Sequence, residues 1–213
     1  MPAMTIFKLH IWIILFVVFT GLTSSGIARA QSAEEYNSMG EAKGSKGDWK
    51  GALQDYSKAI ELNPNFEKAY GNRAYVRNIL GDYKGVVEDY DKVIEFDPAK
   101  YSAYYGKALA EGKLGDYEGQ IRDFSVYINH KPDSPFAYAG RAEARSLMGD
   151  YKGAVEDYSS AIELDPQSGV SYKGRGFAEF KLGQFEAGCR DISKAGVLGY
   201  VDADEIIKKY CNK

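Results

Sequence analysis

A 34-residue spacing of turn residues constrains this chain more than any other feature of its sequence. A glycine, a polar residue and an aromatic residue recur together at this spacing, at Gly47-Asp48-Trp49, Gly81-Asp82-Tyr83, Gly115-Asp116-Tyr117, Gly149-Asp150-Tyr151 and Gly183-Gln184-Phe185. Prolines keep the same step, at Pro64, Pro98, Pro132 and Pro166. A fixed period of this length indicates an array of stacked structural repeats.

Each period is predicted to contain two helices. In the segment 151–164, Ala154, Tyr158 and Ala161 recur at steps of four and three, which places them on one helix face. The following Asp-Pro or Asn-Pro ends this helix, because proline disfavours helical geometry in the residue before it. The glycine that precedes the segment can adopt the positive φ of a helix C-terminus, so an earlier helix ends there. Each repeat is therefore a helical hairpin.

This pattern resembles the tetratricopeptide repeat (TPR). Five repeats cover 33–66, 67–100, 101–134, 135–168 and 169–202, within a repeat region of 31–202. Family-type positions are filled by Tyr70, Tyr104, Tyr138, Tyr172, Ala74, Ala108, Ala142, Ala59 and Ala161. Gly119-Gln120 departs from the family pattern in repeat 3, and repeat 5 lacks its closing proline. The resemblance implies an all-α, right-handed superhelical solenoid of five TPR hairpins. Residues 203–213 are expected to add a capping helix, because the terminal repeat of a solenoid needs a polar outer face.

Residues 1–30 have the pattern of a secretory signal peptide. Lys8 precedes an uncharged apolar run at residues 11–19, and Ala28-Arg29-Ala30 predicts cleavage before Gln31. A membrane anchor is the alternative, but the run is about half the ~20 residues that a spanning helix needs. We therefore expect an exported protein, periplasmic as first choice or else secreted, with no membrane segment after cleavage.

Charge and cysteine content restrict the function further. The 27 Lys and Arg nearly balance the 30 Asp and Glu, which does not indicate a nucleic-acid-binding surface. The two cysteines, Cys189 and Cys211, are too few for a structural zinc site, and no metal or cofactor is predicted. In an oxidising compartment they are expected to form a disulfide that ties down the cap, the alternative being two unpaired thiols.

Opposite charges recur at two positions of the repeat. The seventh position of repeats 2 to 5 is basic and the twenty-third position of every repeat is aspartate, which gives the sets Arg73, Lys107, Arg141, Arg175 and Asp55, Asp89, Asp123, Asp157, Asp191. One interpretation is a line of cations that awaits an acidic ligand. The other is a structural charge ladder in which each aspartate pairs with the base 18 residues later, in the next repeat. The second is favoured because Met39 fills the basic slot that has no preceding aspartate, and Lys209 follows Asp191 at the same step.

The resemblance also implies where a partner would bind. First helices of successive TPR repeats line a concave groove that mostly holds a peptide or a partner helix. By resemblance the groove residues here are Lys68, Tyr75, Tyr105, Leu109, Phe136, Lys173, Phe177 and Phe180. This mixture fits a peptide with apolar anchors and acidic character. Alternatively, several of these aromatic residues pack between repeats.

The predicted function is that of a non-catalytic scaffold or adaptor for a protein or peptide partner. The predicted mature chain has one histidine, His130, and no activated nucleophile is apparent, so no catalytic residue is predicted. Two alternatives stay open. One is a structural spacer or a self-assembling repeat protein that stacks end to end, and the other is a small exported enzyme.

Overall fold

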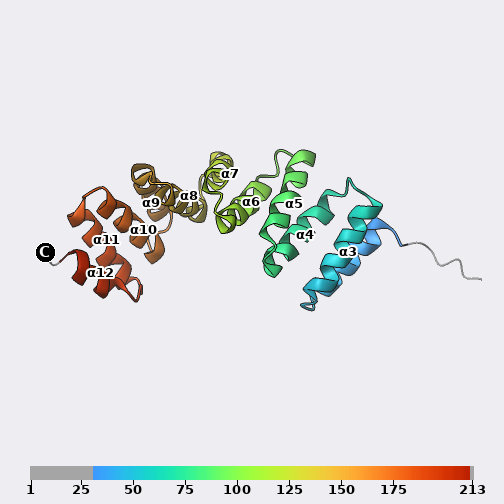
Figure 1. Cartoon of the computed structure of the whole chain (residues 1–213), viewed down its shortest axis with the longest axis horizontal. Coiled ribbons are helices and arrows are strands. Elements are labelled where there is room, and N and C mark those ends of the chain that lie inside the picture. Colours follow the sequence, from blue (N-terminus) through green and yellow to red (C-terminus); the bar gives the residue numbers. More distant parts are fainter. Residues whose placement is uncertain (1–30, 212–213) are drawn as a thin grey trace, which may run out of the picture. The chain divides into compact units, whose positions relative to one another are not determined.

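The computed structural model describes residues 31–211, and the predicted signal peptide at residues 1–30 lies outside them. Within the described range the regular structure is α-helical, with eleven helices (Figure 1). In chain order they are α2 (Ala33–Gly44), α3 (Trp49–Leu62), α4 (Glu67–Leu80), α5 (Tyr83–Phe96), α6 (Tyr101–Leu114), α7 (Tyr117–His130), α8 (Pro135–Leu147), α9 (Tyr151–Leu164), α10 (Gly169–Lys181), α11 (Phe185–Val197) and α12 (Ala203–Tyr210).

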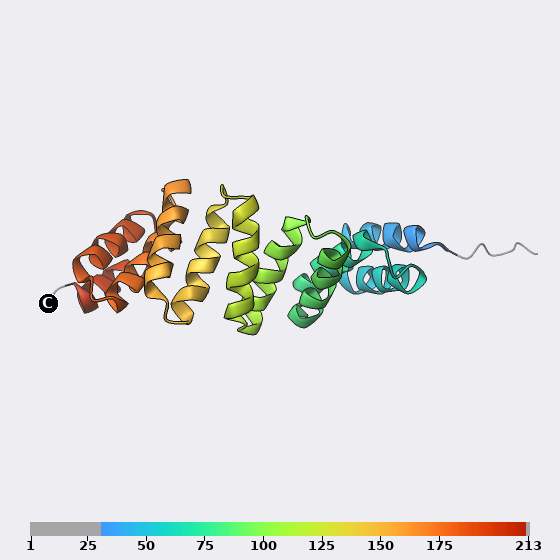
Figure 2. The ribbon, with the colours of Figure 1, turned by 90° about the horizontal axis from the view of Figure 1, so that it is seen from above.

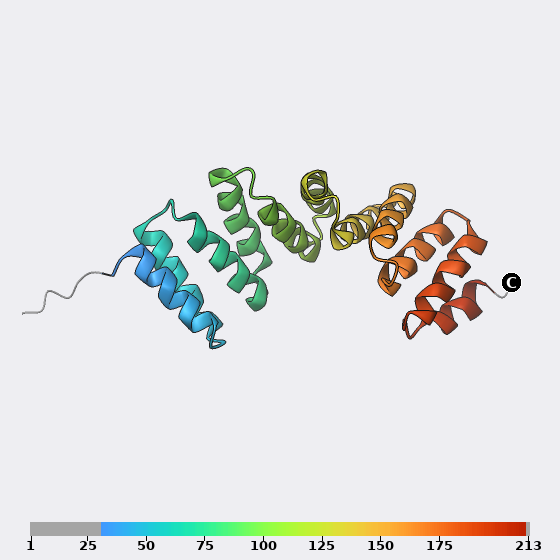
Figure 3. The same ribbon diagram turned by 180° about the vertical axis from the view of Figure 1, so that it is seen from behind.

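The helices pack as hairpins in chain order. α2 packs on α3, α4 on α5, α6 on α7, α8 on α9 and α10 on α11, and the second helix of each hairpin contacts the first helix of the next (Figure 2). α12 packs against α11 and follows the last hairpin, as the view from behind also shows (Figure 3). The predicted all-α solenoid of TPR-like hairpins with a final helix is thus confirmed.

The turn inside each hairpin depends on one glycine and one aspartate. Gly81 has φ +79°, a left-handed conformation that strains other residues, and the equivalent glycine of each hairpin is also left-handed. The next residue, Asp82, caps the second helix: its Oδ1 accepts a hydrogen bond from the Gly85 amide at 3.0 Å. The fifth turn has Gln184 in this place, whose side chain makes no capping bond.

Contacts between repeats depend on an aromatic ring that lies against a glycine. Phe124 on α7 is fully buried, and a Cβ at Gly140 on α8 would lie 2.6 Å from its ring. The same contact joins Tyr90 to Gly106 and Tyr158 to Gly174. A methyl group has no room at these positions, so the glycines set how closely consecutive hairpins approach.

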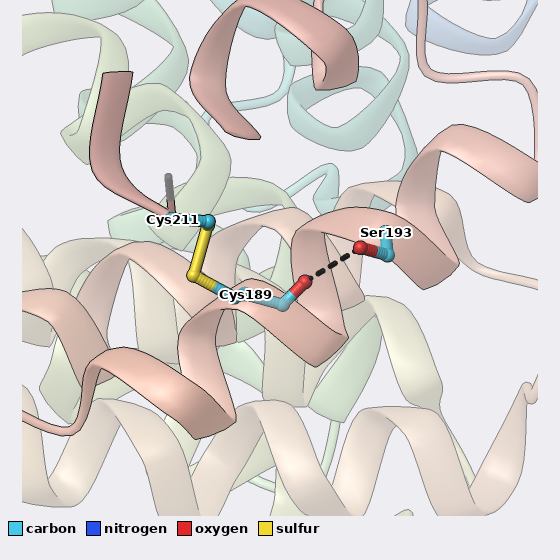
Figure 4. The surroundings of a disulfide bond; sticks show 3 residues. All are labelled: Cys189, Ser193 and Cys211. Carbon is cyan, nitrogen blue, oxygen red and sulfur yellow. Dashed lines mark hydrogen bonds between the residues drawn. A yellow bond between two sulfur atoms is a disulfide. The ribbon is translucent and has the colours of Figure 1, made fainter. Parts of the chain in front are cut away.

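The last hairpin is covered by α12. Phe180 on α10 is buried, and its ring stacks on Tyr210 of α12 with 5.0 Å between centroids. Cys189 on α11 forms a disulfide with Cys211 at the end of α12 (Figure 4). The Cys189 carbonyl also accepts a hydrogen bond from the Ser193 hydroxyl at 2.8 Å. The cap is therefore held by a covalent bond and by aromatic packing.

Candidate binding groove

Three pockets lie along the side of the array formed by α4, α6, α8 and α10, which we call the first-helix face. Each pocket opens between two consecutive first helices, and the second helix of the earlier hairpin forms its floor. The N-terminal pocket lies between α4 and α6, the central pocket between α6 and α8, and the C-terminal pocket between α8 and α10. Their volumes are about 520, 250 and 270 Å³. The repeat itself thus generates a row of side-chain-sized hollows.

The N-terminal pocket owes its size to Gly71. A Cβ at this position would have no atom within 4 Å, so the space that a side chain would fill is open. The two lysines of its rim are already neutralised. Lys68 contacts Glu41 at 2.7 Å, and Lys100 contacts Glu67 at 3.1 Å.

The C-terminal pocket is more apolar and keeps uncompensated positive charge. Leu147, Phe177 and the aromatic floor residue Tyr158 line it. Burial raises the pKa of the Tyr158 phenol, so this floor stays neutral at physiological pH. Lys181 at its rim has no ion pair within the described residues, and the Lys173 ammonium lies 4.9 Å from the Tyr200 ring centroid. An apolar hollow with cationic rims suits an apolar side chain that has carboxylates beside it.

The central pocket adjoins the C-terminal one. Leu147 lines both, and Leu109, Lys113 and Glu143 complete the exposed part of the central pocket. Lys113 has no ion pair within the described residues, although Glu143 shares the pocket with it. The two pockets therefore form one continuous surface with an apolar residue at their junction.

Four of the eight predicted groove residues line these pockets, and two more are exposed elsewhere on the first helices. Lys68, Leu109, Lys173 and Phe177 line the three pockets. Phe136 at the start of α8 is 71% exposed. Tyr75 is also exposed, and its ring meets Trp49 edge-on at 6.3 Å between centroids.

Two predicted groove residues belong to the core instead. Tyr105 is half-buried and packs on Phe124 and Tyr127 at centroid distances of 5.6 and 4.9 Å, against a hydrophobic cluster that also includes Ala137 of α8. Phe180 is 8% exposed because α12 covers the end of the array at that point. The prediction for Phe180 is wrong, because its ring is stacked on Tyr210 of α12 and is not available to a groove ligand.

The pocket floors were missed by the sequence analysis. Tyr151 and Tyr158 lie on the second helix α9, whereas family resemblance directs attention to first helices. A signal was available, because aromatic residues recur at the same place of the second helix, in Tyr56, Tyr90, Phe124 and Tyr158. Gly71, which leaves the N-terminal pocket open, was missed for a different reason: it lies on the first helix α4, but the resemblance identifies groove positions by their side chains and glycine has none.

The charge ladder exists, but its pairing differs from the prediction. Each aspartate of repeats 2 to 5 is bound by the basic residue 16 positions earlier, on the first helix of its own hairpin. The pairs and closest distances are Arg73–Asp89 at 2.7 Å, Lys107–Asp123 at 3.3 Å, Arg141–Asp157 at 2.6 Å and Arg175–Asp191 at 2.6 Å. The predicted 18-residue step is wrong because the two antiparallel helices of one hairpin bring these positions face to face.

The pairing at the two ends of the ladder also differs from the prediction. Asp55 of repeat 1 contacts Lys43 on its own hairpin at 2.7 Å. Asp191 is held by Arg175, whereas the Lys209 ammonium lies 5.2 Å from the Tyr210 ring centroid. The ladder is structural and mostly buried, so it offers no row of free cations to an acidic ligand.

The ladder still links neighbouring repeats through serine. Arg141 donates to Ser125 of the preceding hairpin at 2.9 Å, and Arg175 donates to Ser159 at the same distance. Burial nevertheless raises the pKa of Asp89, and the Arg73 guanidinium opposes that rise. The Arg73–Asp89 pair thus has a desolvation cost that its hydrogen bonds offset.

Other kinds of site are not apparent in the described part of the chain. Residues 31–211 contain no cluster of three or more His, Cys, Asp or Glu side chains placed to hold a metal ion. Among the helices of this range, none has the length and apolar character required to cross a bilayer.

Comparison with known proteins supports the repeat assignment. Residues 33–66, 67–100 and 137–168 match models of the tetratricopeptide repeat, so these segments are similar to TPR repeats. A 50-residue segment is 44% identical to MJ0572, an uncharacterized protein of Methanocaldococcus jannaschii. The segment makes up 24% of this chain and 58% of that protein, so the match spans somewhat over half of the relative's length.

Solved TPR structures share the fold over most of the chain. The crystal structure of MamA superposes with a TM-score of 0.74 and 22% identity, over 85% of this chain and 96% of MamA. YrrB, described as a TPR protein with an unusual peptide-binding site, has a TM-score of 0.77 and 17% identity, over 84% of this chain and 92% of YrrB. MamA of Desulfovibrio magneticus RS-1 superposes with a TM-score of 0.74 and 20% identity, over 80% of this chain and 97% of that structure. At these identities the likeness extends to the fold alone.

Proposed function

We propose that this chain is an exported, non-catalytic scaffold that binds a segment of a partner protein on its first-helix face. The observation that carries this proposal is the joined central and C-terminal pockets, where apolar residues remain exposed beside lysines without ion pairs. Leu147 is 58% exposed and Phe177 is 36% exposed. Exposed apolar residues gathered in a hollow are typical of binding surfaces rather than of a plain spacer.

The proposed ligand has apolar anchors and acidic neighbours. Leu147 and Phe177 provide the apolar contact, while Lys113 and Lys181 provide charge at the two rims. Since neither lysine is engaged within the described residues, a carboxylate would not have to displace an existing partner. The peptide-binding site ascribed to YrrB, which has the same fold, is consistent with this use of the surface.

Binding is tested by affinity capture from the exported protein fraction, with the protein as bait. We expect a specific partner that Leu147→Ala/Phe177→Ala loses. The matched control is Leu62→Ala/Leu164→Ala, which removes leucines of similar exposure from the ends of second helices and should retain the partner. A partner retained by both variants would show that the binding site does not lie on the first-helix face. Capture of nothing by any variant would favour the spacer.

Export rests on the sequence of residues 1–30 and on the Cys189–Cys211 disulfide, which suits an oxidising compartment. The test is expression of the full chain in a bacterium, with fractionation and N-terminal sequencing of the product. A periplasmic or secreted product that begins at Gln31 is expected. A cytoplasmic product that retains Met1 would refute export.

A further inference from the structure

The eleventh position of the repeat reverses its charge along the array. It is basic in repeats 1, 2 and 4, as in Arg77 and Arg145, but acidic in repeats 3 and 5, as Glu111 and Glu179. The side chain there packs over the start of the second helix: a Cβ at Gly119 would lie 2.8 Å from the Glu111 carboxyl carbon, and one at Gly85 would lie 2.7 Å from Arg77 Nε. The eleventh position, at the contact between the two helices of a hairpin, thus carries a cation in some repeats and a carboxylate in others.

Where the eleventh position is basic, its side chain helps to neutralise the ladder aspartate of the same hairpin. Arg77 contacts Asp89 at 3.0 Å, in addition to Arg73, so two guanidinium groups surround one buried carboxylate. Arg145 and Arg141 surround Asp157 in the same way in repeat 4. These repeats have no excess of buried negative charge.

In repeat 3 the carboxylates outnumber the buried cations. The Lys107 ammonium lies 2.7 Å from Asp91 on α5, 3.3 Å from Asp123 on α7 and 3.7 Å from Glu111 on its own helix. Three carboxylates therefore share one lysine that is 13% exposed. Arg122 approaches Glu111 at 3.5 Å and Asp123 at 3.4 Å, but it is mostly exposed, so water screens its charge.

The surroundings of Glu111 disfavour its ionised form. Its residue is 3% exposed, and its Oε2 accepts no hydrogen bond from the described residues. Burial, followed by the Asp123 carboxylate, raises the pKa of Glu111 to about 7, against the opposing effects of Lys107 and Arg122. Asp116 at the start of α7 adds a further negative charge.

We propose that Glu111 binds a proton in the folded protein, and that this proton controls how tightly α6 packs on α7. A protonated Glu111 removes one of the two buried like charges that face Lys107. When Glu111 ionises, the two carboxylates repel each other in a site with too few cations. Because Gly112 and Gln120 of the same two helices line the central pocket, the proton would also act on that part of the first-helix face.

The direction of the pH effect follows from where the proton is held. Glu111 binds the proton more tightly in the folded chain than in the unfolded chain, where its pKa is near the ordinary 4.5. The stabilisation of the folded state by this proton is therefore complete below the pKa of Glu111 in the unfolded chain. It is lost as the pH rises through the folded-state pKa of about 7. Most acidic groups of stable proteins behave in the opposite way, which makes the effect distinctive.

The test is hydrogen–deuterium exchange of the protein at about pH 5.5 and about pH 8, corrected for the intrinsic pH dependence of exchange. Amides of α6 and α7 should exchange at least about tenfold faster at the higher pH, since a tenfold change corresponds to a shift of one pKa unit. Glu111→Gln should abolish this acceleration, because a neutral amide cannot ionise. Glu179→Gln is the matched control in repeat 5, where Arg175 already binds Asp191 through two nitrogens, and it should leave α6 and α7 unchanged.

A second variant separates charge from packing. Glu111→Arg/Arg122→Glu recreates the arrangement of Arg77 and Glu88 in repeat 2, and it should also remove the acceleration in α6 and α7. The carboxyl carbon of Glu111, followed by NMR in the wild-type protein, should titrate well above 4.5. Equal acceleration in the wild type and Glu111→Gln, or a Glu111 midpoint near 4.5, would overturn the proposal.

Discussion

Each arginine of the ladder joins two hairpins because its guanidinium donates on two sides. Arg141 binds Asp157 within its hairpin through Nε and one terminal nitrogen, and its other terminal nitrogen binds Ser125 of the preceding hairpin. A lysine has a single nitrogen and cannot reproduce this fork. Repeat 3, which has Lys107, accordingly replaces the serine with Asp91, so that an ion pair bridges the hairpins instead.

Removal of one ladder partner should cost more than removal of both. Arg141→Met leaves the buried Asp157 with Arg145 alone, and we expect the free energy of unfolding to fall by about 2–3 kcal/mol. Arg141→Met/Asp157→Leu should recover part of that loss, because the buried carboxylate is gone and Arg145, which is 24% exposed, still has Asp150 at 3.8 Å. Urea denaturation of both variants measures the difference. A double variant no more stable than the single one would show that the pair contributes net stability.

Glycine positions should respond to alanine in opposite directions. Gly140→Ala forces a methyl group against the buried Phe124 ring, and overpacking of this kind typically costs about 1–3 kcal/mol. Gly71→Ala meets no atom within 4 Å and replaces a helical glycine, which should stabilise by about 0.5–1 kcal/mol. Thermal unfolding compares the two variants directly. A similar loss in both would mean that Phe124 does not control the approach of α8.

At the scale of the element, the hairpin turn and the cap helix differ in what holds them. The turns depend on glycines of positive φ and aspartate caps, which are local and therefore visible in the sequence. α12 has only eight residues and contacts α11 on one side, so local propensity is insufficient to hold it. The disulfide and the stacking of Tyr210 on Phe180 supply the additional stabilisation that α12 needs.

Loss of the disulfide should therefore loosen the cap before it affects the array. Replacement of both Cys189 and Cys211 by serine opens a loop of 22 residues, and the chain-entropy model gives a loss of about 3 kcal/mol. Hydrogen exchange should accelerate first in α12 and at the end of α10, and not in α4 to α7. Uniform acceleration along the chain would show instead that the cap supports the whole array.

At the scale of the whole molecule, the period of the sequence predicts the hairpins because each repeat contacts mainly its neighbours. The ladder partners could not be predicted, since offsets of 16 and 18 residues both match aspartate with a base, and only the packing of antiparallel helices distinguishes them. Phe180 could not be assigned either, because its burial depends on ring stacking with Tyr210 of α12 and with Phe185, and the repeat period does not predict these contacts. Leu109 and Phe177 were predictable because their repeat position lines a pocket in both cases.

Binding of an apolar and acidic peptide to the first-helix face can be tested by peptide selection. A random-peptide library panned against the protein should yield sequences with an aromatic or aliphatic anchor next to Asp or Glu. Their affinity should fall at least about tenfold in Leu147→Ala/Phe177→Ala and in Lys113→Glu/Lys181→Glu, which corresponds to about 1.4 kcal/mol. It should be unchanged in Leu62→Ala/Leu164→Ala. Selected peptides that are basic, or that bind all these variants equally, would show that the first-helix face is not the proposed binding site.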